Sequence, residues 1–159
     1  MSGPAQSAPR GGSAAVRSNN EQASPSHVRS SDPNRLVAWW ADLLGYAVED
    51  CHDLVSGLLE SGVIGDADVV ELNARLFFKD AVAARDPDDN GPRLYFQRVP
   101  EPKVVKNRVH LDIPVRQEEL DDEVQRVTGA GASFVEFRSH PGHRWAVMQD
   151  PEGNEFCLH

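Results

Sequence analysis

The chain repeats one order of secondary-structure elements, and this repeat constrains its fold more than any other feature. From residue 27 the hydrophobic pattern predicts a strand, a helix and three strands, and the same order starts again near residue 105. Such a unit leaves one face of its sheet uncovered, so two units are expected to share a concave surface. The sequence therefore predicts an α+β fold of two βαβββ modules that form a cupped, mostly antiparallel sheet, with a ligand site inside the cup.

Module one covers residues 27–99. A first strand is expected at His27–Ser31. Asp32-Pro33 then begins a helix, because a capping carboxylate precedes a proline at the first helical position, and Gly45 ends it. Further strands are predicted at Tyr46–Glu49, Asp68–Leu72, Leu76–Lys79 and Arg93–Val99. A short helix at Asp53–Val63 belongs to an insert that makes this module the longer one.

Module two covers residues 105–159. The pattern predicts a strand at Arg108–Ile113, a helix at Gln117–Val127 and strands at Ser133–Phe137, Trp145–Met148 and Glu155–Leu158. His140 and His143 flank Pro141-Gly142 and are therefore expected in a loop, although His143 with Trp145 also suits the mouth of the cup.

The folded domain is expected to span residues 27–159. Residues 1–26 consist mainly of Ser, Ala, Gly and Pro, with no aromatic residue and three charges. A segment of this composition buries too little apolar surface to offset the entropy of ordering, so residues 1–26 are predicted to be a disordered tail.

The charge balance excludes some classes of partner. The chain has 25 Asp and Glu against 16 Lys and Arg, a formal net charge of −9. A nucleic-acid binder or a membrane-surface protein needs a cationic footprint, so neither is expected. The acidic charge instead favours a cationic small ligand by long-range attraction. No secretory signal or membrane-spanning run is recognised, so the protein is expected in the cytoplasm, with Cys51 and Cys157 as free thiols.

Three motifs carry a family resemblance: Asp32-Pro33 followed by Trp40 and Leu44-Gly45-Tyr46, then Asn107–Asp112, and finally Asp150–Phe156. Together they resemble the glyoxalase-like branch of the vicinal oxygen chelate superfamily, which also contains bleomycin-resistance proteins and extradiol dioxygenases. The resemblance implies paired βαβββ modules and a homodimer. In the enzymes of this superfamily it further implies a divalent metal in the cup, held by one residue from the first and last strand of each module.

The metal-ligand positions that the resemblance implies do not carry the usual residues. The two first-strand positions fall on Pro25 and Arg108, and the two last-strand positions fall on Gln97 and Cys157. A proline cannot ligate and an arginine is a fixed cation, so the usual set of two His and two Glu is absent.

A shifted metal site is the alternative. Side chains two apart on a strand share a face, so His27 and His110 occupy matching places in the two modules. With Gln97 and either Glu155 or Cys157, they would form a ligand set for one divalent zinc, nickel or iron ion.

Two functions follow from these patterns. The first is a metal-free module that binds a small ligand in the cup, with candidate contact residues Tyr95, Gln97, Arg108, His110, Cys157, His143 and Trp145. The second is a lyase, isomerase or dioxygenase-like enzyme, in which His110 and Gln97 bind the metal or polarise the substrate and Glu155 or Asp112 moves the proton. Simpler alternatives stay open: His110 as part of a polar network, and Cys157 as a small buried apolar residue.

Overall fold

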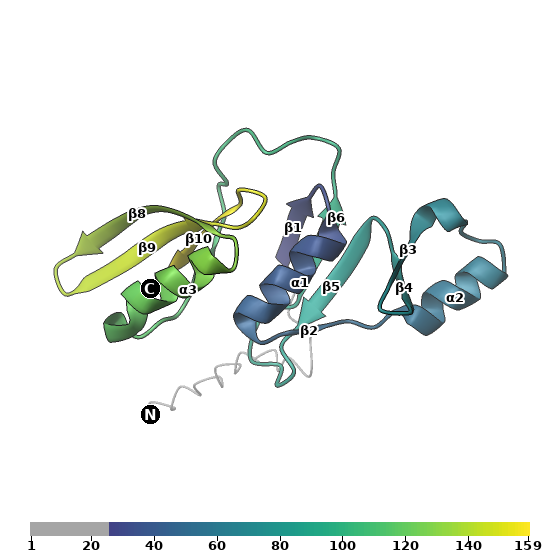
Figure 1. Cartoon of the computed structure of the whole chain (residues 1–159), viewed down its shortest axis with the longest axis horizontal. Helices are drawn as coiled ribbons and strands as arrows, with labels where there is room; N and C mark the ends of the chain where they lie inside the picture. Colours follow the sequence, from purple (N-terminus) through teal and green to yellow (C-terminus); the bar gives the residue numbers. More distant parts are fainter. Residues whose placement is uncertain (1–25) are drawn as a thin grey trace, which may run out of the picture.

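A computed structural model describes residues 26–159 of the chain. The predicted tail lies outside these residues except for Ser26, which already belongs to the first strand. Figure 1 shows the two modules side by side, joined by an irregular linker that leads from the end of the first to the start of the second. Among the described residues, no helix is long and apolar enough to cross a membrane.

The first module has the predicted βαβββ topology. Its sheet runs β1-β6-β5-β2, with β1 and β6 parallel and the other neighbours antiparallel. Its elements are β1 (Ser26–Ser30), α1 (Pro33–Leu44), β2 (Ala47–Val48), β5 (Ala81–Arg85) and β6 (Leu94–Arg98).

The strand assignment within this module needs one correction. The predicted strands at 68–72 and 76–79 do not join the main sheet, but form a separate hairpin of β3 (Val69–Leu72) and β4 (Arg75–Phe78) beside α2 (His52–Glu60). The place in the main sheet belongs to β5, which the sequence pattern missed. Since β5 is mostly alanine and its three middle residues are all buried, it lacks the polar alternation that marks a half-exposed strand.

The second module repeats the topology of the first. Its sheet runs β7-β10-β9-β8, again with a parallel first and last strand. Its elements are β7 (Leu111–Ile113), α3 (Leu120–Gly129), β8 (Ser133–His140), β9 (His143–Gln149) and β10 (Glu155–Leu158). The predicted first strand is too long at its start, because residues 108–110 precede β7. The α+β fold of two βαβββ modules is confirmed.

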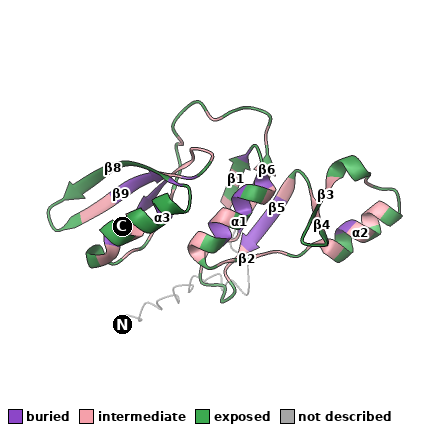
Figure 2. Cartoon of the chain, in the orientation of Figure 1, coloured by how far each residue is buried: buried purple, intermediate pink, exposed green. Residues whose placement is uncertain are grey.

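Helix α1 joins the two modules into one core. Its Asp32 cap accepts a hydrogen bond from the backbone N–H of Arg35, and Gly45 closes it with a left-handed φ of 69°. Trp40, only 2% exposed, packs edge-on against Phe156 of β10. The indole N–H of Trp40 also donates to a carboxylate oxygen of the buried Asp150 at 3.1 Å. Figure 2 shows the buried residues concentrated in α1 and the middle strands of the two sheets.

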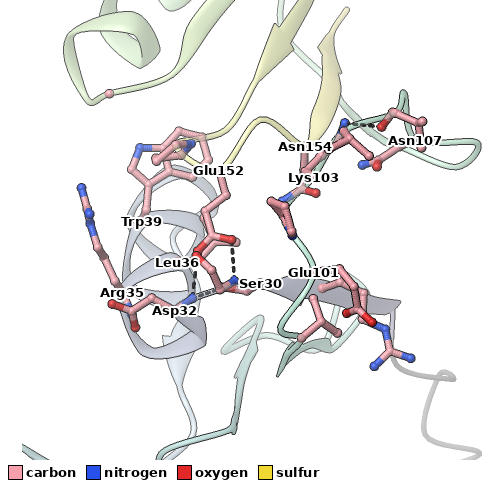
Figure 3. A pocket seen from close by; sticks show the side chains of 18 of the residues that line it. Ser30, Asp32, Arg35, Leu36, Trp39, Glu101, Lys103, Asn107, Glu152 and Asn154 are labelled. Atoms are coloured by element: carbon pink, nitrogen blue, oxygen red, sulfur yellow. Dashed lines mark hydrogen bonds between the residues drawn. The ribbon is translucent and has the colours of Figure 1, made fainter.

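A second polar contact fixes the turn before β10 to the start of α1. The Glu152 carboxylate accepts hydrogen bonds from the Ser30 hydroxyl at 2.9 Å and from the backbone N–H groups of Ser31 and Asp32 at 2.7 and 3.0 Å (Figure 3). Burial acts to raise the pKa of Glu152, but these hydrogen bonds bring it below its usual value. Glu152 thus places a negative charge of module two at the N-terminus of the helix of module one.

Candidate functional site

The uncovered face of the second sheet forms a cup. Along β10, Phe156 and Leu158 are fully buried in the core, so Glu155 and Cys157 alternate onto the opposite face. Trp145 lies on the same face of the neighbouring strand β9. A cavity of about 410 Å³ opens on this face and is lined by Lys106, His110, Asp112, Arg138, His143, Trp145, Val147, Glu155, Cys157 and His159.

Three side chains with different chemistry meet in this cup. The Nε2 atom of His110 lies 3.1 Å from a carboxylate oxygen of Asp112. Cys157 pairs with Asp112 in the parallel register of β10 and β7, and ligand atoms of all three residues lie within 4.8 Å of one another. Burial raises the pKa of the Cys157 thiol, and Asp112 raises it further, while the charges of Lys106 and Arg138 oppose the shift. This thiol is therefore protonated at neutral pH.

Trp145 and several imidazoles form one wall of the cup. The ring of His143 stacks on Trp145 with centroids 5.9 Å apart, and His140 tilts against Trp145 at 5.3 Å. The expected loop position of these two histidines is wrong: His140 ends β8 and His143 begins β9, where they pair across the turn. His143 and Trp145 do line the cup, together with His159.

Glu155 lies where the cup meets the junction of the modules. Its carboxylate accepts a hydrogen bond from the backbone N–H of Asn107 at 2.9 Å and pairs with the ammonium of Lys103 at 2.9 Å. Burial acts against the charged form, but these two partners lower the pKa of Glu155 to about 2. Glu155 is therefore a charged and already paired carboxylate near neutral pH.

A second cavity, of about 360 Å³, lies between β1 and the residues that lead into β7. It is lined in part by His27, Arg108, His110 and Glu155, so His110 and Glu155 border both cavities. The two modules thus contribute side chains to one continuous region.

Tyr95 and Gln97 of β6 lie apart from both of these cavities. Tyr95 packs against His27 with ring centroids 5.1 Å apart, and the guanidinium of Arg93 lies over its ring. The Gln97 side-chain oxygen accepts a hydrogen bond from Arg29. Tyr95 and Gln97 alternate with the buried Leu94 and Phe96, so they lie on the opposite face of β6, and these contacts are with residues of module one.

The structure brings together a different metal-capable set from the one that the sequence suggested. Of His27, Gln97, His110 and Glu155, only His110 belongs to the cluster of His110, Asp112 and Cys157. The shifted four-residue site stays a prediction. A set of imidazole, carboxylate and thiol suits zinc by its donor chemistry, because zinc is held by nitrogen, oxygen and sulfur ligands.

Arg108 was predicted inside the first strand of module two, but it lies outside that strand. In the parallel register of β7 and β10, Asp112 lies opposite Cys157. Arg108 precedes β7 and lines the junction cavity instead. The sequence also missed Lys106, Arg138 and His159 as lining residues. Alternation with Glu136 gives a signal for Arg138, whereas Lys106 lies in an irregular linker without periodicity.

A larger cavity, of about 880 Å³, lies outside the cup (Figure 3). It is enclosed by the linker, the start of α1 and the turn at residues 150–154, and Arg35, Trp39, Lys103 and Glu152 are among its lining residues. Two of its charged residues already have partners within the chain: Glu152 accepts a hydrogen bond from Ser30, and Lys103 forms an ion pair with Glu155. The cup, although smaller, is where imidazole, thiol and indole groups converge.

Comparison with known proteins decides the family. The family model described as a glyoxalase-like domain matches residues 27–159. The chain belongs to the glyoxalase-like domain family. This assignment confirms the resemblance to the vicinal oxygen chelate superfamily. The match also begins at the first residue of the predicted domain. A search of curated proteins finds no match.

Solved structures of this superfamily share the fold at low sequence identity. A glyoxalase/bleomycin resistance protein/dioxygenase family enzyme from Burkholderia phytofirmans PsJN is 15% identical over 85% of this chain and 94% of its own, with a TM-score of 0.56. The fosfomycin resistance protein FosX from Mesorhizobium loti is also 15% identical, over 89% of this chain and 92% of its own, with a TM-score of 0.57. A mutant of FosX from Listeria monocytogenes, in complex with Mn(II) and 1S,2S-dihydroxypropylphosphonic acid, is 12% identical over 84% of each chain, with a TM-score of 0.54.

Proposed function

We propose that this glyoxalase-like domain binds a small organic ligand in the cup of its second module. The observation that carries the proposal is the convergence of His110, Asp112, Cys157 and Trp145 on one cavity of about 410 Å³. A cavity of this size, with an aromatic wall and a few polar groups, is typical of small-molecule sites. Trp145 would provide the contact surface, and the pair of His110 and Asp112 would orient the ligand by hydrogen bonds.

The usual metal set of the superfamily is degenerate in this chain. Besides the replaced ligand positions, basic side chains contact or lie near the groups that a metal would need as ligands. Lys103 pairs with Glu155 at 2.9 Å, and Lys106 and Arg138 line the cup. Because Lys103 already pairs with Glu155, this carboxylate is less available as a metal ligand, which supports binding of an organic ligand without a metal.

The ligand that suits the cup best is a cationic aromatic compound. The net charge of −9 attracts cations at long range. Within residues 26–159, Asp112 forms ion pairs with histidines only, whereas Arg138 is paired with Glu136. Asp112 can thus receive a ligand cation, and the Trp145 ring offers a cation–π contact.

Binding can be tested with a panel of small aromatic compounds that carry an ammonium, a neutral or a carboxylate group on the same ring. The proposal predicts saturable binding of the ammonium compounds, measured by calorimetry, with a rise in Tm. Asp112→Asn and Trp145→Ala should weaken it about tenfold or more. Glu118→Gln serves as the control, because Glu118 is an exposed carboxylate on the short 3₁₀ turn before α3 and does not line the cup cavity. Binding that survives both cup substitutions would contradict the proposal.

A metal-dependent enzyme is the second candidate, and the cluster of His110, Asp112 and Cys157 favours it. These residues would hold a zinc ion and leave a coordination position open, as catalytic zinc sites do. The metal would supply Lewis-acid polarisation of neighbouring substrate oxygens. Glu155 is poorly suited to move a proton there, because a carboxyl group with a pKa of about 2 is a weak base.

Elemental analysis separates the two candidates. The purified wild-type protein, the His110→Ala variant and the Cys157→Ala variant should all lack stoichiometric metal if the cup binds an organic ligand alone. Stoichiometric zinc, nickel or iron in the wild type that both substitutions remove would establish the metal site and favour the enzyme.

A further inference from the structure

The insert that lengthens module one forms a cavity of its own. This insert consists of α2 and the hairpin of β3 and β4, and Figure 1 shows it at one end of the molecule, beside module one and away from module two. A cavity of about 570 Å³ lies between the hairpin and the start of α1. It shares no lining residue with the cup, so a ligand bound here would be independent of the cup ligand.

Hydrogen bonds hold the hairpin against α1. The side-chain amide of Asn34 donates to the backbone carbonyl of Phe78 at 3.1 Å and to that of Lys79 at 3.2 Å. The backbone N–H of Lys79 in turn donates to the carbonyl of Asp68 at 2.8 Å, which extends the hairpin by one bond at its open end. Because these bonds tie the first turn of α1 to the hairpin, the walls of the cavity are in place before a ligand binds, which lowers the cost of binding.

Basic side chains dominate the charge of this cavity. Its charged lining residues are three cations and one acid, namely Arg35, Lys79, Arg98 and Asp32. The Asp32 carboxylate already accepts the capping hydrogen bond from the backbone N–H of Arg35. Arg98 pairs with Asp80 at 3.3 Å, whereas within residues 26–159 neither Arg35 nor Lys79 has an ion-pair partner. Two positive charges are therefore available to a negative group inside the cavity.

Strand β3 gives the same cavity an apolar wall. Three of its four residues, Val69, Val70 and Leu72, line the cavity, and Glu71 does not. The two valines are half-buried, and Leu72 is 39% exposed. A ligand with an apolar group next to its charge would cover these side chains and gain apolar burial.

We propose that this cavity is a second ligand site, which binds a small organic phosphate monoester. A phosphate monoester carries nearly two negative charges at neutral pH, so it balances the two unpaired cations, Arg35 and Lys79, and accepts hydrogen bonds from both. Its organic group contacts the apolar wall at Leu72. The net charge of −9 disfavours anions at long range, so binding depends on these local cations and weakens as salt is added.

Amide chemical-shift mapping with phenyl phosphate tests the site. Saturable shifts are expected on residues 31–35 and 69–72, and not on residues 155–159 of the cup. Inorganic phosphate lacks the apolar group and benzoate has a single charge, so each should bind at least about tenfold more weakly. Shifts concentrated on the cup, no saturation up to about 10 mM phenyl phosphate, or equal binding of inorganic phosphate would overturn the proposal.

Charge-neutral variants test the two cations. Lys79→Gln and Arg35→Gln should each raise the dissociation constant of phenyl phosphate about tenfold or more. Arg116→Gln is the matched control, because it removes the same charge from an exposed side chain outside the cavity, and it should leave binding unchanged. Binding that both cavity variants retain, or that all three variants weaken equally, contradicts the site.

A second pair of variants tests the apolar wall within the insert itself. Leu72→Asp places a carboxylate in the cavity and should raise the dissociation constant about tenfold or more. Leu54→Asp adds the same charge to α2 at a side chain that is 59% exposed and lies outside the cavity, so binding should persist. Circular dichroism checks that both variants fold. Unchanged binding in folded Leu72→Asp, or an equal loss in Leu54→Asp, would refute the role of this wall.

Discussion

Glu152→Gln removes the charged contact that ties the second module to helix α1, and its cost can be worked out from the structure. The carboxylate accepts three hydrogen bonds, from the Ser30 hydroxyl and from the N–H groups of Ser31 and Asp32. Hydrogen bonds to a charged acceptor each contribute about 1.5–3 kcal/mol when well buried. Because Glu152 is only half-buried and an amide keeps one acceptor oxygen, we expect a total loss of about 2 kcal/mol. For a domain of this size that loss lowers Tm by about 6 °C.

The pH dependence gives the same prediction a second readout. The pKa of Glu152 lies below its ordinary value of 4.5, so its contribution to stability is fully present above pH 4.5 and is lost as the pH falls through the folded-state pKa. The Tm difference between wild type and Glu152→Gln should therefore be constant near neutral pH and shrink below about pH 4. Scanning calorimetry measures both.

Glu118→Gln is the matched control, because Glu118 is an exposed carboxylate on the short 3₁₀ turn before α3. It should change Tm by less than about 1 °C. A Glu152→Gln protein as stable as this control at pH 7 would refute the stabilising role of the Glu152 hydrogen bonds between the modules. A Tm difference that grows on acidification would refute it as well.

Three further outcomes follow from the structure. Glu155→Gln should lower the free energy of unfolding by about 2 kcal/mol at pH 7; because the pKa of Glu155 is about 2, urea titrations should show this difference present above pH 4.5 and lost toward pH 2. The buried Cys157 thiol, with its raised pKa, should react with iodoacetamide far more slowly than Cys51 at pH 7, and mass spectrometry of timed aliquots would show equal rates if this is wrong. Gly45→Ala should cost about 1 kcal/mol, because Gly45 has a φ of 69°, and an unchanged thermal midpoint would contradict the role of this left-handed cap.

Local signals in the sequence predicted the larger part of the fold. Asp32-Pro33 and Gly45 delimit α1 because caps act within a few residues of the chain. The strands of module two follow from their alternation. Strand β5 was missed because its alanines are buried and give no alternating pattern. The hairpin of β3 and β4 was misassigned to the main sheet because a strong strand pattern does not say which strand it pairs with.

The site was predicted less well, because it depends on contacts between strands. Alternation along the last strand puts Glu155 and Cys157 on one face, and both line the cup. The register of β7 against β10 is set by tertiary packing, and it decides that Asp112, and not Arg108, lies opposite Cys157. Lys106 reaches the cup from an irregular linker, so no periodicity could have indicated it.

The central claim, a ligand site in the cup of the second module, is tested most directly by amide chemical-shift mapping. The measurement would titrate the ammonium-bearing aromatic compounds into labelled protein in the presence of a chelator. We predict saturable shifts concentrated on residues 106–112, 143–147 and 155–159, and Trp145→Ala should need about tenfold or more ligand to reach half of these shifts. Shifts around Arg35 and Trp39, which border the larger cavity outside the cup, or binding that the chelator abolishes, would contradict the account.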